Sequence, residues 1–337
     1  MVSSKDVARL AGVSQPTVSR ALRDDPRLTD ATKQKVRQAA DQLGYSPNSF
    51  GRALATGRST RIGLLVTDLD NQFYIHVIAP MHEEIVDAGY ELILITETSG
   101  PEAIAARATA LGLGGVILAT TTTTSLLPLR LADRGIPFVY FNRISELVPA
   151  DATVVDPTRG MQELVEAMVE LGHQRVGAIL GPRETSTGAT REAALRSALA
   201  DHGLELADAD TRRGPFTVEL GQSAARELLD STDRPTVLVC ANDLVALGAL
   251  NAAAECGLAV PEDVSVVGFD ALPITGWQFV HLATIHYDLE GMARTAARAM
   301  VQRMDAGCAP TADADQPQRT VFPTSLVLRR SLGAAPL

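Results

Sequence analysis

Short apolar runs alternate with amphipathic segments from Arg61 to the end of the chain. The first series has apolar runs at 62–66, 91–96, 115–119 and 138–141, with helical patterns near 75–88, 102–111 and 126–134. The second has runs at 175–180, 211–214, 236–240, 264–269 and 324–329, with helical patterns near 160–171, 191–202, 219–229 and 243–256. Strands that alternate with helices form parallel sheets with helices on both faces. We therefore expect an α/β core of two doubly wound parallel-sheet subdomains.

The first residues of the chain have a helical period instead. Val7, Leu10 and Ala11 are spaced as one face of a helix, and Val18 with Ala21 begins a second such face. Both faces are short, so the helices they predict can pack only against each other or a neighbour. A third helical pattern reaches Leu43 and completes an all-α head.

Capping residues mark the ends of these helices. Ser3 and Asp6 have the spacing of a capping box, and Gly12 suits the left-handed position just past a helix end. Ser14 can cap the next helix, in whose first turn Pro16 is tolerated, and Thr29 can cap the third. Two short helices joined by a tight glycine turn predict a helix-turn-helix.

The polar face of the second helix carries residue types that bind DNA. Gln15 and Arg20 can read adenine and guanine in the major groove, and Pro16 can offer only shape or contact with a thymine methyl. Thr17 and Ser19 have short hydroxyls suited to phosphate oxygens. A helical hairpin with a solvated polar face would show the same pattern.

Charge separates the head from the rest of the chain. Residues 1–60 hold ten Lys or Arg and five Asp, a net charge of +5, whereas the whole chain carries −10. The remainder therefore carries −15, and a basic head on an acidic body suits a protein that meets phosphate at one end.

Several classes of protein lack support in the sequence. No apolar run approaches the roughly 20 residues of a membrane helix, and the polar N-terminus lacks the apolar region of a signal peptide, so we expect a cytoplasmic protein with no membrane partner. Cys240, Cys256 and Cys308 have no metal-binding spacing and read as buried thiols, and His173 reads as a surface residue. No catalytic, metal or cofactor motif appears, so we expect neither an enzyme nor a cofactor.

Residues 47–60 read as a linker that could form about two turns of helix, with Phe50 and Leu54 on one side. An isolated helix of that length is unstable in water, and Gly51 weakens it by a further ~0.5–1 kcal/mol relative to Ala. A segment that folds only against a partner is a candidate switch.

Several ordered motifs resemble the lactose-repressor/galactose-repressor family of bacterial transcription regulators. The resemblance rests on Lys5-Asp6-Val7-Ala8, Ala11-Gly12-Val13-Ser14, Thr17-Val18-Ser19-Arg20, Leu43-Gly44-Tyr45-Ser46-Pro47-Asn48 and Arg52-Ala53-Leu54. It implies a hinge helix at the linker whose Leu54 wedges into the minor groove, as apolar side chains do in bent DNA. Members of this family often have Ala at the position where this chain has Gly51. The expected DNA-binding residues are Ser4, Ser14, Gln15, Pro16, Thr17, Ser19, Arg20, Thr29, Tyr45, Asn48, Arg52 and Leu54.

The resemblance also implies the domain plan. We expect a DNA-binding domain at 1–46, a hinge at 47–60 and a core at 61–337 that resembles the type I periplasmic-binding-protein fold. The first subdomain should comprise about 61–159 with 290–320, and the second 160–289 with 321–337.

Polar and aromatic residues follow the predicted strands, where ligands bind to parallel sheets. The expected effector-binding residues are Asp70, Asn71, Phe73, Asn142, Arg191, Phe216, Asn242 and Asp270, whereas Arg143 and Asp243 read as a salt-bridge partner and a helix cap. By resemblance, Arg191, Asn242 and Asp270 match the most regular ligand contacts of the family. Amides, a carboxylate, a guanidinium and rings suit a polyhydroxylated ligand such as a sugar.

The sequence therefore predicts a homodimeric transcription regulator whose partners are operator DNA and a small-molecule effector. Because members of the family are most often repressors, we expect a repressor. The residue types at the predicted effector site favour a carbohydrate as the effector. The tail after residue 331 has no heptad repeat, so we expect no tail-mediated tetramer. A corepressor-dependent or nucleoside-responsive regulator and a soluble sugar-binding protein remain alternatives.

Overall fold

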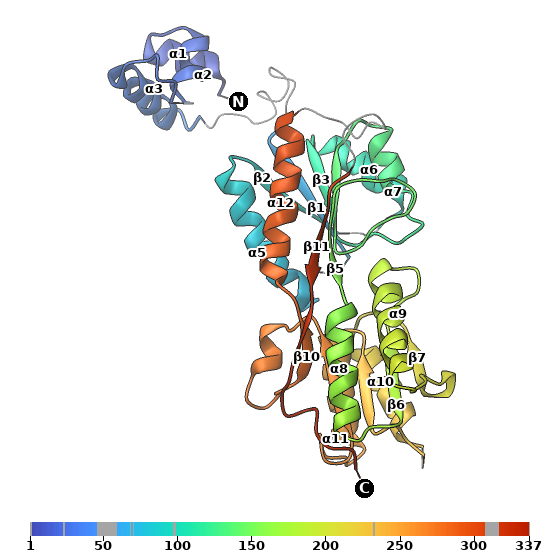
Figure 1. Ribbon diagram of the computed structural model, residues 1–337. Helices are drawn as coiled ribbons and strands as arrows, with labels where there is room; N and C mark the ends of the chain where they lie inside the picture. The colour runs from blue at the N-terminus through green and yellow to red at the C-terminus, as the bar shows by residue number, and fades with distance from the viewer. Residues whose placement is uncertain are drawn as a thin grey trace. The chain divides into compact units, whose positions relative to one another are not determined.

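The computed structural model describes residues 2–22, 24–45, 59–67, 69, 71–96, 99–231, 233–306 and 317–336. The chain divides into two compact units, Met1–Thr60 and Arg61–Leu337, which are described separately. Figure 1 shows the elements of each unit. The expected hinge helix and the residues Asn48, Arg52 and Leu54 lie outside the described residues, as does Asp70 in the core.

The first unit contains α1 (Ser4–Ala11), α2 (Gln15–Ala21) and α3 (Asp30–Gln42). The predicted caps are present: the N–H and the hydroxyl of Ser3 donate to Asp6 at 3.0 and 2.7 Å, and Gly12 has φ 63°. Ser14 accepts from Thr17 N–H at 3.4 Å. Each cap satisfies backbone groups that a short helix leaves unpaired at its ends.

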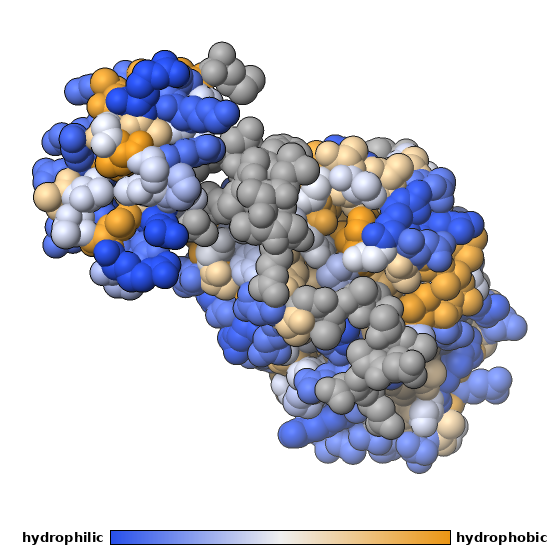
Figure 2. Space-filling view, turned by 90° about the horizontal axis from the view of Figure 1, so that it is seen from above, coloured by the Kyte–Doolittle hydropathy of each residue, from blue (hydrophilic) through white to orange (hydrophobic). Residues whose placement is uncertain are grey.

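A small apolar core joins the three helices of the first unit. Val7 and Ala11 of α1 pack with Val18 of α2 and Val36 of α3. The expected core position of Leu10 is wrong, because its side chain is 50% exposed. In α1 the buried stripe runs through Val7, Ala8 and Ala11, which leaves Leu10 on the flank of the helix. The visible surface of this unit is largely hydrophilic, with a few isolated hydrophobic residues (Figure 2).

The second unit contains two six-stranded sheets. The first has the order β11-β5-β4-β3-β1-β2, and all of its pairings are parallel. Its strands are β1 (Arg61–Val66), β2 (Glu91–Thr96), β3 (Gly115–Leu118), β4 (Phe138–Phe141), β5 (Ala152–Asp156) and β11 (Arg319–Pro323). Its helices are α5 (Gln72–Asp87), α6 (Pro101–Ala110), α7 (Leu127–Ala132) and α12 (Leu289–Ala306). The pairs α5 with α12 and α6 with α7 cover opposite faces (Figure 1).

The second sheet has the order β12-β10-β9-β8-β6-β7, with only β12 running antiparallel to its neighbour. Its strands are β6 (Val176–Leu180), β7 (Thr211–Arg213), β8 (Val237–Cys240), β9 (Ser265–Phe269), β10 (Ala283–His286) and β12 (Ser325–Val327). Its helices are α8 (Thr158–Glu170), α9 (Ser186–Asp201), α10 (Val218–Leu229) and α11 (Asp243–Glu255), with short 3-10 helices at Asp208–Asp210 and Pro273–Gly276. Buried strands such as β6, β8 and β9 are continuous apolar runs because helices cover both faces.

The chain passes between the two subdomains after β5, between β10 and α12, and between β11 and β12. β11 pairs with β5 from Arg319 to Pro323, so the first sheet extends three residues past the approximate boundary expected at residue 320. Likewise the boundary at 159/160 falls inside α8, which begins at Thr158. Strands end where backbone pairing ends, and pairing is not visible in an apolar pattern.

Three further expectations need correction. Arg191 does not open a helix, because α9 begins at Ser186 under a cap from Thr185. His173 is buried at 1% exposure, and its ring nitrogens make hydrogen bonds with Thr236 Oγ1 at 2.8 Å and Gly333 O at 3.0 Å. Cys240 is buried but Cys256, which follows the last turn of α11, is exposed.

Candidate functional site

The polar face of α2 is open to solvent, as the sequence predicts. Gln15, Pro16, Ser19 and Arg20 are exposed, whereas Val18 on the opposite face is fully buried. No hydrogen bond or ion pair to another described residue holds the Arg20 side chain.

Neighbouring side chains orient parts of this face. The amide nitrogen of Gln15 donates to Ser4 Oγ at 3.0 Å, so a residue of α1 holds the first residue of α2. The hydroxyls of Ser14 and Thr17 lie 2.8 Å apart. Thr29 is exposed at the cap of α3, while Tyr45 is half-buried against the core of the unit.

The described effector candidates of the core lie around one cavity. Asn71 and Phe73 come from the start of α5, and Asn142 follows β4. These residues face a second set from the other subdomain: Arg191 on α9, Phe216 before α10, Asn242 at the start of α11 and Asp270 after β9. The carboxyl ends of parallel strands meet there, which explains why segments so distant in sequence come together.

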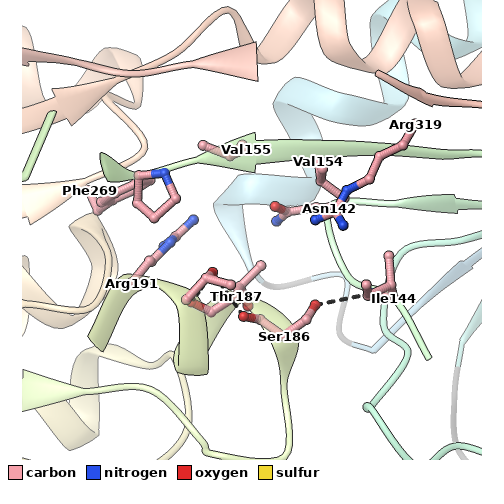
Figure 3. Close-up of a pocket in the computed structure, with 11 residues that line it drawn as sticks. Asn142, Ile144, Val154, Val155, Ser186, Thr187, Arg191, Phe269 and Arg319 are labelled. Atoms are coloured by element: carbon pink, nitrogen blue, oxygen red, sulfur yellow. Dashed lines mark hydrogen bonds between the residues drawn. The ribbon is translucent and has the colours of Figure 1, made fainter. Parts of the chain in front are cut away.

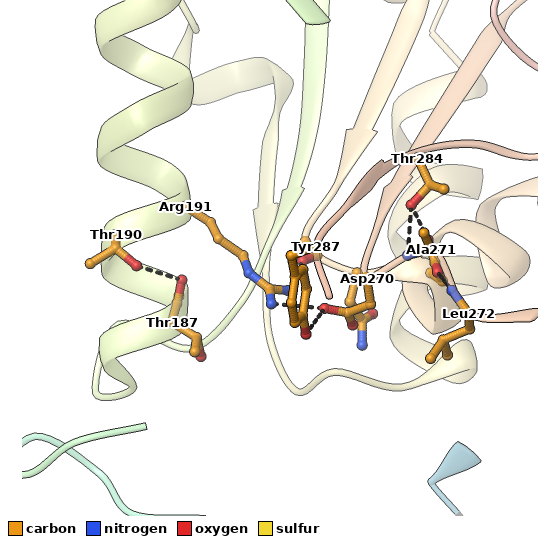
Figure 4. A network of polar contacts seen from close by, with 12 residues as sticks. Thr187, Thr190, Arg191, Asp270, Ala271, Leu272, Thr284 and Tyr287 are labelled. Atoms are coloured by element: carbon orange, nitrogen blue, oxygen red, sulfur yellow. Dashed lines mark hydrogen bonds and ion pairs between the residues drawn. The ribbon is translucent and has the colours of Figure 1, made fainter. Parts of the chain in front are cut away.

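A buried ion pair forms the floor of this cavity. Arg191 donates to Asp270 Oδ1 at 2.9 Å and to the carbonyl of Ala241 at 2.7 Å (Figure 4). The hydroxyl of Tyr287 donates to the same carboxylate oxygen at 3.1 Å. The Arg191 guanidinium also lies 3.8 Å from the centroid of the Phe269 ring. These contacts fix the guanidinium plane, and a fixed plane can present its remaining N–H groups in one geometry.

Burial dominates the electrostatics of this network. It raises the pKa of the Asp270 carboxyl, although Arg191 and the Tyr287 hydroxyl oppose the rise. It also raises the pKa of Asp243 well above its ordinary value, and the nearby Asp270 charge adds to that effect. Asp243 accepts from Leu272 N–H at 2.7 Å and from Thr284 Oγ1 at 2.6 Å. Asp243 is therefore structural but not the expected helix cap.

Asn242 provides that cap instead. Its Oδ1 accepts from Val245 N–H at 3.0 Å, which leaves the amide nitrogen as the group available for a ligand. Asn71 has the same arrangement at the start of α5, where its Oδ1 accepts from Phe73 N–H at 3.0 Å. Both residues thus cap the N-terminus of a helix and also line the cavity.

Asn142 differs from the other amides. It has φ 63°, a left-handed conformation that costs a non-glycine residue energy, and it is 9% exposed. Among the described residues, none donates a hydrogen bond to its Oδ1. A buried acceptor without a donor is costly, so this oxygen is suited to accept from a ligand.

Aromatic rings line opposite sides of the cavity. Phe73 belongs to the core of the first subdomain, where its ring lies 5.5 Å from that of Tyr74 and 6.4 Å from that of Phe141. Phe216 lies in the other subdomain, and the Arg143 guanidinium lies 5.1 Å from its ring centroid. Arg143 thus contacts a ring across the subdomain boundary.

Hydrogen bonds donated by two backbone N–H groups also link the subdomains directly. Thr123 N–H donates to the carbonyl of Glu184 at 2.8 Å, and Ile144 N–H donates to Ser186 Oγ at 3.1 Å. The loop after β3 is therefore held against the loop that precedes α9, and the loop after β4 is held against the first turn of α9.

Sequence reasoning missed several residues near the cavity. Tyr287 follows β10, whose apolar run is too short to be predicted as a strand from the sequence. The rule that ligands lie beyond the ends of strands therefore could not select Tyr287. Arg319 begins β11, whose residues are mostly exposed and give no apolar signal. Thr187 lines the cavity because α9 starts five residues earlier than expected.

The chemistry of the described residues is recognition by hydrogen bonds and rings. They contain no group of three or more His, Cys, Asp or Glu side chains arranged to hold a metal ion. Nor does any described helix have the length and apolarity to cross a membrane.

A helix-turn-helix unit followed by a two-subdomain α/β core with a polar cavity defines the class of bacterial transcription regulators. Residues 4–48 match the bacterial regulatory proteins of the lacI family, and residues 165–332 match a periplasmic binding protein-like domain. The HTH-type transcriptional regulator CelR of Thermobifida fusca is 30% identical over 334 residues, covering 96% of each chain. The chain belongs to the lacI family.

Solved structures give the same result. A lac repressor dimer bound to operator and the anti-inducer ONPF has a TM-score of 0.84 and 26% identity, and the match covers 99% of both chains. A complex of the regulator CelR with cellobiose has a TM-score of 0.74 and 29% identity, covering 98% of this chain and 100% of that one. The matched relatives are transcription regulators and not enzymes.

Proposed function

We propose that this protein is a homodimeric repressor that binds a pseudo-palindromic operator and responds to a small polyhydroxylated effector in the core cavity. The observation that carries the proposal is the cavity itself: Arg191 is fixed by Asp270, and the buried Asn142 oxygen beside it receives no hydrogen bond from any residue that the structure describes. In a chain with an open helix-turn-helix face, such a cavity supports control of DNA binding by a ligand.

Each head would read one half-site. Gln15 and Arg20 would contact base edges, and Pro16 would add shape or a thymine-methyl contact. Ser4, Ser14, Thr17, Ser19, Thr29, Tyr45, Asn48 and Arg52 would hold the head on the backbone, which fixes register. Leu54 from each chain would open the central step and bend the duplex.

A sugar fits the donor and acceptor set. The remaining N–H groups of Arg191 and the Asn242 amide nitrogen can donate to hydroxyl oxygens, and the Asn142 oxygen can accept from a hydroxyl. The rings of Phe73 and Phe216 can cover apolar faces of a pyranose. The relative CelR, solved with cellobiose, supports a carbohydrate as the effector class.

The effector can act only by binding one arrangement of the two subdomains more tightly than another. The bonds from Thr123 to Glu184 and from Ile144 to Ser186 exist in the arrangement described above. A ligand that strengthens or breaks this arrangement would change how the two subdomains meet, and through the hinges it would change operator affinity.

In the proposed function the protein acts in the cytoplasm, where operator DNA is found. It catalyses no reaction and uses no cofactor. A sugar-binding protein without DNA binding is the rival, and the basic head disfavours it.

Selection of bound duplexes from a random pool by the full-length protein tests the proposal. A recovered pseudo-palindrome would support it, whereas no enrichment at low salt, even with metabolite extract added, would contradict it.

A further inference from the structure

A second cavity extends from the first toward the edge of the first sheet. It has a volume of about 50 Å³ and shares Asn142, Thr187 and Arg191 with the first cavity. Its far end is formed by Arg319, the first residue of β11, whose side chain extends toward Asn142 (Figure 3). We call this second cavity the Arg319 pocket. Because the two cavities share lining residues, one ligand could contact both.

Charge in the Arg319 pocket is unbalanced. The charged side chains that line it are Arg191 and Arg319, and no acidic residue lines it. Arg191 is neutralised by Asp270, but Arg319 has no carboxylate within ion-pair distance among the described residues. Asp156 lies between two lining residues, yet its carboxylate accepts from Thr158 N–H at 3.0 Å and from Thr158 Oγ1 at 2.6 Å. Within the described part of the chain, the lining of the pocket therefore carries positive charge at Arg319 that no carboxylate pairs with.

The N-terminus of α9 adds to that charge. This helix has 16 residues, and its first two, Ser186 and Thr187, line the pocket opposite Arg319 (Figure 3). The cap from Thr185 Oγ1 goes to Gly188 N–H at 3.1 Å, so it does not satisfy the first two N–H groups. Unsatisfied N–H groups and the helix dipole both favour an anion at this end of a helix.

The Asn142 oxygen imposes a second requirement. It is buried and without a donor, and it lies in the wall that the two cavities share. An anion cannot satisfy an acceptor, whereas a hydroxyl group can. A small molecule that carries both a hydroxyl and an anionic group would match both features.

We infer that the effector is an acidic sugar, with a carboxylate or phosphate held between Arg319 and the first turn of α9 and a neighbouring hydroxyl donated to Asn142. This inference rests on the proposed function and specifies its ligand class. Arg319 belongs to the first subdomain and α9 to the second, so the anion would bridge them. The neutral sugar of the same skeleton lacks that bridge.

Calorimetric titration of the full-length protein tests the inference with matched probes. Each set contains a neutral mono- or disaccharide, its uronic or aldonic acid, and its phosphate ester, beginning with glucose, glucuronate, gluconate and glucose 6-phosphate. An acidic member should bind at least about tenfold more tightly than its neutral partner, because hydrogen bonds to charged groups are the stronger ones. Comparison of the carboxylate and phosphate arms identifies which anion is used.

Substitutions at Arg319 assign the effect to this residue. Arg319→Gln should reduce the ratio of affinities for the acidic and the neutral probe to about one, while Arg319→Lys should retain part of that ratio. Arg107→Gln, at an exposed arginine of α6, is the matched control.

Three results would overturn the inference: a neutral sugar as the tightest binder of the panel, an acidic probe whose affinity is the same in Arg319→Gln, or no binding by any acidic probe. Operator binding by the same preparations is measured in parallel, so that failure of this inference is distinguished from failure of the proposed function.

Discussion

Arg191 and Asp270 are 79 positions apart in the sequence, and they form an ion pair of 2.9 Å whose side chains are 8% and 3% exposed. Loss of one partner leaves a charge without compensation in a buried site. Asp270 also has φ 113°, so it holds an unfavourable backbone conformation at the same place. Backbone strain beside a buried pair is typical of functional sites, where the surrounding packing holds both in place.

Asp270→Asn should therefore destabilise the core and abolish the effector response. We expect a loss of roughly 3–5 kcal/mol in the free energy of unfolding, as found when a buried pair loses one member. Chemical denaturation measures this loss, and operator titrations with and without effector measure the response. Asp201→Asn, at the exposed end of α9, is the control. A normal effector response in Asp270→Asn would move the effector site elsewhere.

Arg20→Ala should relax the preference of the head at one base position. A lost bidentate contact to guanine costs about 1–3 kcal/mol at that position. Selection from a random duplex pool gives the preference of the variant base by base. If affinity falls equally for all sequences, Arg20 contacts phosphate instead of a base.

Ser4→Ala should broaden the preference at the position that Gln15 reads. The change removes the acceptor that holds the Gln15 amide nitrogen, so the side chain samples more conformations. Gln15→Ala should produce a larger loss at the same base pair. Unchanged selection by Ser4→Ala would show that the bond between these residues does not position Gln15 on DNA.

Ser186→Ala should favour separation of the two subdomains. It leaves Ile144 N–H without its acceptor, at a cost of about 1 kcal/mol. Small-angle X-ray scattering should show a larger radius of gyration without effector, and the effector should bind more weakly. Ser223→Ala is the control, because this residue is exposed on α10 and its hydroxyl donates to the Leu220 carbonyl of the same helix, away from both cavities.

His173 should make the core less stable in mild acid. Burial lowers the pKa of its ring below the ordinary value of 6.5, so the unfolded chain takes up a proton before the folded chain does. The contribution of the neutral His173 ring to the free energy of unfolding is therefore complete above the ordinary pKa, and it is lost as pH falls below that value. Thermal unfolding between pH 8 and pH 5, measured for the wild type and His173→Gln, should show a smaller slope in the variant. Equal slopes would rule out His173 as the source.

Local features were predictable from the sequence. Ser3, Gly12, Ser14 and Thr29 were assigned to helix ends, and the structure agrees because a cap depends on residues within four positions. Buried strands such as β1 and β8 were equally visible as apolar runs. The rule that ligand residues follow parallel strands was enough to select Asn142, Asn242 and Asp270, which the structure brings to one cavity.

Edge strands and long-range contacts were decided only by the tertiary structure. β11 has mostly exposed residues, and what makes it a strand is pairing with β5, more than 160 positions earlier. For the same reason the sequence could not place Arg319 beside Asn142. His173 was mistaken for a surface residue because its partners, Thr236 and Gly333, lie far along the chain. Composition and spacing determine what a segment can form by itself, whereas burial and pairing depend on which distant segment packs against it.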